Sequence, residues 1–277
     1  MINRIYPQIS LRWITISCFE IRIGNHTIVT DPTIGLSPNC EEEASVIQGA
    51  DLITVSHIHW DHIADVKELA EKFHSKILVG DLSAMDFIRY LNCNQADLYP
   101  MSHQTTLDFG WVKVTALMGR HSDMKEPFLQ TASRFERNPL YAAYPELSSL
   151  MAYGSLEYRN YLFETPDRFR ILFYGNLPAE EQLHLLKDIR PDILLMQFTR
   201  PIPKEISQFA AQLSAKVLIP HHMDLKKRLL EYKPQAEELC QIFEAERPGS
   251  IGITPVPKQW YDFSESINCR NSLQSDL

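Results

Sequence analysis

Residues 51–62, which read DLITVSHIHWDH, constrain the fold of this chain more than any other segment. The apolar run Leu52–Val55 predicts a buried strand, and three histidines and an aspartate follow directly after it. Extended backbone would project His57 and His59 to the same side of the chain. Packed together without a cation, these side chains would leave buried polar atoms unsatisfied. The segment therefore predicts a metal site at the carboxyl end of a core strand, where open α/β sheets place their ligand sites.

The rest of the chain alternates strand-like with helix-like segments. Apolar runs of strand length occur at Trp13–Phe19, Thr27–Thr30, Lys76–Val79, Trp111–Leu117, Tyr161–Glu164, Arg170–Tyr174, Ile193–Phe198 and Lys216–Ile219. Helical periodicity occurs at Ala64–Phe73, Ser83–Leu91, Ala179–Ile189, Lys204–Leu213 and Pro234–Phe243. The second half repeats the order of the first, and no flexible linker separates them. We expect one domain of two similar α/β halves over residues 1–263, with an inserted loop region at 122–157 and a polar tail at 264–277.

Composition narrows the class of partner. The formal net charge of −8 disfavours a broad contact with the phosphates of nucleic acid. Five scattered cysteines without a CxxC pair are typical of free thiols in a reducing cytoplasm. No apolar run approaches the roughly 20 residues that a membrane span needs. We expect a cytoplasmic protein that acts on a small molecule, with no nucleic acid partner and no membrane span; a homo-oligomer is left open.

The motif His57-x-His59-x-Asp61-His62 after a buried strand resembles the signature of the metallo-β-lactamase superfamily. Further features agree in order along residues Leu11 to Pro257: Asp31-Pro32, His121 after a strand, Tyr174-Gly175, and the segment Pro220-His-His-Met-Asp224. The pattern is most similar to the branch of ascorbate-phosphate lactonases and N-acyl-phosphatidylethanolamine phospholipase D. This resemblance implies an α/β (α+β) fold, the four-layer αββα sandwich, with metals at one edge between the two sheets.

The resemblance also implies a ligand set. The first metal would take His57, His59 and His121, and the second would take Asp61, His62 and either His221 or His222. In this branch the ligand falls two residues after the strand-ending residue, which favours His222 and leaves His221 as a neighbour. Zinc is the metal we expect, with one or two ions per chain, and Mn or Fe also suit imidazole and carboxylate ligands.

One residue departs from the family pattern. The bridging aspartate of the family falls at Asn176 here, and its amide oxygen is a weaker ligand for a dication than a carboxylate. We therefore expect one metal held tightly and a second held weakly or not at all. Asn176 and Asp31 are candidates for weak or supporting contacts with the metals. Alternatively, another carboxylate such as Asp123 takes the place of the missing aspartate.

The chemistry that follows is hydrolysis by metal-activated water. We expect a metal-dependent hydrolase of an ester, lactone or phosphodiester bond, with Asp61 as the catalytic residue that orients the water and acts as general base. Arg120 and Arg200 are candidates to receive an anionic group of the substrate, although each is more typical of a surface or ion-pair position. The alternatives are a degenerate metal-binding protein that lost catalysis with its bridging aspartate, and a nuclease of the same superfamily.

Overall fold

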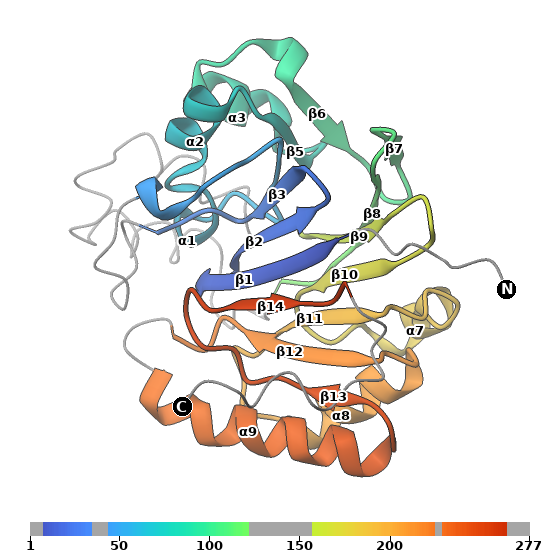
Figure 1. Ribbon diagram of the computed structural model, residues 1–277. Helices are drawn as coiled ribbons and strands as arrows, with labels where there is room; N and C mark the ends of the chain where they lie inside the picture. The colour runs from blue at the N-terminus through green and yellow to red at the C-terminus, as the bar shows by residue number, and fades with distance from the viewer. Residues whose placement is uncertain (1–7, 35–43, 122–156, 225–228, 265–277) are drawn as a thin grey trace, which may run out of the picture.

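Two seven-stranded sheets form the centre of the molecule (Figure 1). The computed structural model describes residues 8–34, 44–121, 157–224 and 229–264. The helices α1, α2 and α3 gather on one side of the sheets, and α7, α8 and α9 gather on the other. One apolar core joins residues of both sheets, including Trp13 of the first and Phe173 of the second. This arrangement confirms the predicted four-layer αββα sandwich.

The first sheet is antiparallel at one end and parallel at the other. Its strands, in spatial order, are β14 (Trp260–Asp262), β1 (Ile9–Thr15), β2 (Cys18–Ile23), β3 (His26–Thr30), β4 (Leu52–Thr54), β5 (Lys76–Gly80) and β6 (Leu98–Met101). The outer face of this sheet packs against α1 (Trp60–Ile63), α2 (Val66–Phe73) and α3 (Ala84–Leu91) through a second apolar cluster. Short 3-10 turns lie at Ala44–Val46 and Gln95–Asp97.

The second sheet has the same plan. Its strands, in spatial order, are β13 (Ile251–Gly252), β12 (Val217–His221), β11 (Ile193–Gln197), β10 (Arg170–Tyr174), β9 (Arg159–Glu164), β8 (Lys113–Met118) and β7 (Thr106–Asp108). The strands from β10 to β13 run parallel, and those from β7 to β10 antiparallel. The helices connected to it are α7 (Glu180–Leu186), α8 (Pro203–Gln212) and α9 (Leu229–Glu246).

The prediction of one strand over Trp13–Phe19 is wrong, because the chain turns back between β1 and β2. Ile16 adopts a left-handed backbone with φ of 51°, which is unusual for a β-branched residue. Its carbonyl accepts hydrogen bonds from Trp13 Nε1 at 3.0 Å and from the backbone of His222 at 2.7 Å. The turn residues Ile16 and Ser17 include none of the Gly, Asn or Pro that most strongly signal a turn, and Ser17 is only a weak signal.

Other boundaries differ less. Helix α9 begins at Leu229, before the predicted start at Pro234. The strands β6, β7, β13 and β14 were not predicted, because they are too short to show an alternation of apolar and polar residues. Most of the predicted inserted loop, residues 122–156, lies outside the described residues, as do residues 265–277 of the predicted tail. None of the described helices combines the length and apolar composition needed to cross a bilayer.

Candidate metal centre

Loops that follow β4, β8 and β12 bring six of the predicted ligands together. His57 and His59 lie in the loop after β4, and α1 begins immediately afterwards, carrying Asp61 and His62. His121 follows β8 in the second sheet. The sixth residue, His222, follows β12 of that sheet. The candidate site is therefore assembled from segments that follow strands of both sheets.

His57, His59 and His121 form what we call the first ligand group. One nitrogen of each lies within 4.8 Å of the others. Nε2 of His57 and Nε2 of His121 lie 3.0 and 3.2 Å from Nδ1 of His59. His57 and His59 are buried and His121 is half-buried. All three members of this group are imidazoles, so the group carries no negative charge of its own.

Asp61, His62 and His222 form the second ligand group, which meets the same 4.8 Å criterion. Nε2 of His222 lies 3.3 Å from Nε2 of His62, and an Asp61 carboxylate oxygen lies 3.7 and 3.6 Å from these two nitrogens. His222 has a left-handed backbone with φ of 62°, held by its bond to the β1–β2 turn. Non-glycine residues in this conformation are often concentrated at functional sites.

The donor atoms of both groups fit a metal ion. Two nitrogens at about 2.05 Å from a tetrahedral zinc lie about 3.3 Å apart, close to the nitrogen separations seen here. Burial, followed by the neighbouring His62, holds the pKa of His57 well below its ordinary value. Burial likewise lowers the pKa of His222 to about 4. These rings are therefore neutral at neutral pH, which is the form that binds a cation.

Asp31 supports the second group from behind. Its carboxylate is fully buried, and its Oδ2 lies 2.7 Å from Nδ1 of His62, the nitrogen that faces away from the group. The backbone N–H and the hydroxyl of Ser56 donate to the same carboxylate at 2.7 and 2.6 Å. Burial raises the pKa of Asp31, and the bonds from Ser56 oppose that rise. Asp31 thus touches a ligand residue and lies outside both groups.

Tyr158 supports the first group and was missed by the sequence reasoning. Its buried ring stacks on His57 with centroids 4.8 Å apart, and its hydroxyl donates to Gln197 Oε1 at 2.8 Å. A side chain at Gly175 would place a Cβ 2.6 Å from the Tyr158 ring, and one at Gly119 would collide with it too. Gly119 precedes Arg120 and Gly175 precedes Asn176 in the sequence. A glycine beside each of these predicted site residues was the sequence signal that a large side chain packs close to the backbone there.

His221 and Asn176 do not belong to either ligand group. His221 is fully buried between Phe173, stacked at 5.1 Å, and Phe19, and its Nδ1 lies 3.2 Å from the Ser17 hydroxyl. The Asn176 amide nitrogen donates to the carbonyl of Arg120 at 3.1 Å, and its oxygen accepts from Thr199 at 3.4 Å. Its amide therefore links two loops. The alternative carboxylate, Asp123, lies outside the described residues.

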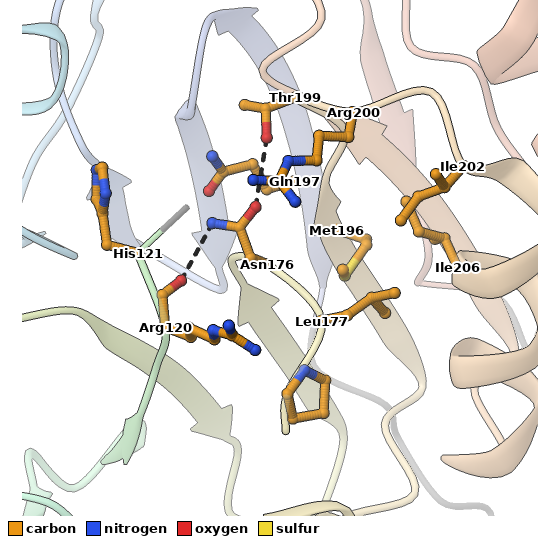
Figure 2. Close-up of a pocket in the computed structure, with 11 residues that line it drawn as sticks. Arg120, His121, Asn176, Leu177, Met196, Gln197, Thr199, Arg200, Ile202 and Ile206 are labelled. Carbon is orange, nitrogen blue, oxygen red and sulfur yellow. Dashed lines mark hydrogen bonds between the residues drawn. The ribbon is translucent and has the colours of Figure 1, made fainter. Parts of the chain in front are cut away.

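A pocket opens beside the first ligand group (Figure 2). His121 and Asn176 lie on one side of it, and the predicted substrate-binding residues Arg120 and Arg200 both line its walls. Both arginine side chains are exposed. The structure therefore brings the two arginines to the same pocket although 80 positions separate them in sequence.

Two mixed sheets with helices on their outer faces, and two histidine-rich ligand groups at one edge, define a protein of the metallo-β-lactamase fold with candidate metal-binding sites. Residues 10–222 match the family described as "Beta-lactamase superfamily domain", and the chain belongs to this family.

Similar proteins agree with this assignment. A protein of Methanoculleus marisnigri named "UPF0173 metal-dependent hydrolase" is 24% identical over 241 residues, which cover 84% of this chain and 90% of that protein. A Polaromonas protein of the same name is 28% identical over 227 residues, or 76% and 75% of the two chains. Among solved structures, the metallo hydrolase Igni18 from Ignicoccus hospitalis shares the fold with a TM-score of 0.69 at 13% identity, covering 92% of this chain and 98% of its own.

Proposed function

We propose that this protein is a metal-dependent hydrolase that uses activated water on an ester, lactone or phosphodiester bond of a small substrate. The observation that carries the proposal is the meeting of two three-residue ligand groups beside a pocket. The relatives named as metal-dependent hydrolases support the reaction class. The motif's similarity to lactonases and to N-acyl-phosphatidylethanolamine phospholipase D supports the choice of bonds.

Six residues would hold the metal: His57, His59 and His121 in one group, and Asp61, His62 and His222 in the other. A dication bound there would lower the pKa of its water toward about 7 and polarise a carbonyl or phosphoryl oxygen. Asp61 is the acidic member of the six. With the metal bound, its carboxylate would orient the attacking water and accept a proton from it. Burial lowers the pKa values of His57, His62 and His222 and so favours their neutral forms, which bind a cation.

We propose zinc as the metal, with Mn or Fe as the other ions these ligands suit. One ion is held tightly and a second more weakly, because the Asn176 amide is engaged by Arg120 and Thr199 and supplies no bridging charge. Elemental analysis of protein purified without chelator tests both statements. About one tightly held equivalent of zinc per chain is the expected result, and two equally tight equivalents would contradict it.

The activity itself is tested with panels of small esters, lactones and phosphodiesters, assayed with metal-loaded protein. Turnover that is abolished by chelator and restored by zinc is expected in at least one panel. No turnover in any panel would favour the degenerate metal-binding protein. The relatives named as metal-dependent hydrolases favour the enzyme over that alternative.

The proposal extends to cellular context and domain organisation. Cys18, Cys93 and Cys240 are free thiols, and Cys18 and Cys240 are buried, as expected in a reducing cytoplasm. Residues 1–263 would act as one domain. A single cooperative unfolding transition followed by two spectroscopic probes is the expected result.

A further inference from the structure

The pocket beside the first ligand group has two chemically different ends (Figure 2). Near His121 its walls are polar, with Asn176, Gln197 and Thr199. Away from His121 the walls are apolar, with Leu177, Met196, Ile202 and Ile206 (Figure 2), and Pro178 also lines the pocket. A molecule that reacts at the metal centre would therefore place a polar part next to the reacting bond and an apolar part beyond it.

The pocket is also positive in an acidic protein. The described residues that line it include Arg120 and Arg200 and no Asp or Glu, whereas the whole chain has a net charge of −8. The Arg200 guanidinium forms no ion pair with the carboxylates of residues 8–34, 44–121, 157–224 and 229–264. In Figure 2 its side chain is directed toward the middle of the pocket. A guanidinium so placed matches the two oxygens of a carboxylate or phosphate.

Hydrogen bonds hold the polar walls in place. Asn176 ties the loop of Arg120 to that of Thr199, the residue before Arg200. Gln197 is fixed by the Tyr158 hydroxyl. Walls held in this way lose little conformational entropy when a ligand binds, so selectivity can reside in their chemistry.

The cavity is small, about 190 Å³. Pockets for drug-sized ligands commonly hold about 300–1,000 Å³. The apolar end therefore accommodates a short aliphatic group rather than a long acyl chain.

We propose that this pocket selects a small substrate bearing a carboxylate or phosphate beside a short aliphatic group, with Arg200 contacting the anion and Ile202 the aliphatic part. The inference rests on the proposed hydrolase function, since it assigns the part of the substrate that does not react. Arg200 is a specificity-determining residue in this account, and the reacting bond is left to the two ligand groups.

Binding is tested without turnover. Calorimetry with metal-loaded protein compares hexanoate, its neutral analogue hexanamide, and acetate, which has the anion without the chain. Hexanoate is expected to bind about 10- to 100-fold more tightly than hexanamide, the range for a hydrogen bond to a charged group. It should also bind about 100-fold more tightly than acetate, because each of its four additional methylenes strengthens binding about three- to fourfold when buried. Equal binding of hexanoate and hexanamide would overturn the proposal.

Variants locate the contacts. Arg200→Gln is expected to abolish the preference for hexanoate over hexanamide, and Arg200→Lys to retain part of it. Lys204→Gln, which removes an exposed cation outside the pocket lining, is the matched control and should leave the preference unchanged. Ile202→Ser should reduce the advantage of hexanoate over acetate. If Arg200→Gln keeps the preference while its melting temperature is unchanged, the carboxylate binds elsewhere, for example at the metal, and the proposal fails.

Two further arms separate the remaining outcomes. Butyl phosphate is compared with hexanoate, and whichever shows the larger loss in Arg200→Gln identifies the anion as phosphate or carboxylate. The ester, lactone and phosphodiester panels are assayed in parallel. Arg200-dependent binding without any turnover would refute the hydrolase function and keep the pocket assignment. Turnover of neutral esters, with hexanoate binding that ignores Arg200, would refute the pocket assignment and keep the function.

Discussion

The two ligand groups are alike in their donor atoms and different in what supports them. The second group contains the carboxylate of Asp61, and the buried carboxylate of Asp31 contacts its His62. The first group contains imidazoles, and two neutral supports lie beside it among the described residues: the Tyr158 ring behind His57, and the Asn176 amide bonded to the residue before His121. One site is thus backed by negative charge and the other by packing and amide hydrogen bonds.

This difference predicts different roles for the two groups. Negative charge in a buried site strengthens the binding of a cation, because a low local dielectric increases the attraction. Neutral supports fix the direction of a ring without adding affinity of that kind. We expect the second group to hold its ion more tightly, and the supports of the first group to control geometry at the pocket.

Removal of a ligand should have the largest effect. His222→Ala should lose the tightly held zinc and reduce kcat/KM by more than about 100-fold, beyond the 10- to 100-fold typical of residues that only support a ligand. His57→Ala should keep that ion after dialysis against dilute chelator and lose the weaker one. Metal content and kcat/KM are the measurements.

His221→Phe is the matched control, since His221 packs against Phe19 and Phe173 and lies outside both groups. It should keep the metal content of the unmodified protein. If it lost the tight ion while His222→Ala retained it, the assignment of the second group would be wrong.

Removal of the charged support should come next. Asp31→Asn keeps the shape of the side chain and removes its charge, so the affinity for the tight ion should fall about 10- to 100-fold. Competition with a zinc-binding dye measures this change. Asp51→Asn, at an exposed carboxylate that accepts from the backbone of Thr27, should leave the affinity unchanged. If the affinity for the weaker ion fell more than that for the tight ion, the charged support of Asp31 would belong to the weaker site.

Asn176→Asp tests the amide support. A carboxylate cannot donate to the Arg120 carbonyl, so the variant should lose about 1 kcal/mol of unfolding free energy and about 10-fold in kcat/KM. Asn94→Asp is a control with the same change in charge, because Asn94 only accepts from Ala96 through its side-chain oxygen. A gain in activity together with a second tightly held ion would show instead that position 176 bridges two metals.

The smallest effect is expected for Tyr158→Phe. The ring that stacks on His57 stays, and the bond to Gln197 is lost, so unfolding free energy should fall by about 1 kcal/mol. KM should rise about threefold with little change in kcat, because Gln197 lines the pocket. Tyr161→Phe loses a bond to the Val55 carbonyl and should cost similar stability without changing KM. Equal KM values in the two variants would show that the Tyr158 hydroxyl does not position Gln197 for substrate binding.

Much of the fold was predictable because the longer strands and amphipathic helices have strong periodicity, as in Val66–Phe73 and Ile193–Gln197. The elements missed include two- to four-residue strands and the β1–β2 turn at Ile16 and Ser17, where the local sequence carries little signal. That turn matters for the site, because the carbonyl of Ile16 holds His222. Contacts between residues about 200 positions apart leave no trace in local pattern.

The sequence by itself determined the class of chemistry, since His57, His59, Asp61 and His62 converge through the local geometry of one strand end and one helical turn. It also marked His121 and the pair His221 and His222 by their places after strands. Tertiary structure decided the rest: that His222 turns toward His62 while His221 packs in the core, that Asn176 bonds to Arg120 and Thr199, and that Tyr158 lies behind His57. The contacts of His222 and Tyr158 depend on how the two sheets pack, and those of Asn176 join loops that follow three strands of the second sheet. In each case the direction of the side chain is fixed by long-range packing rather than by neighbours in the chain.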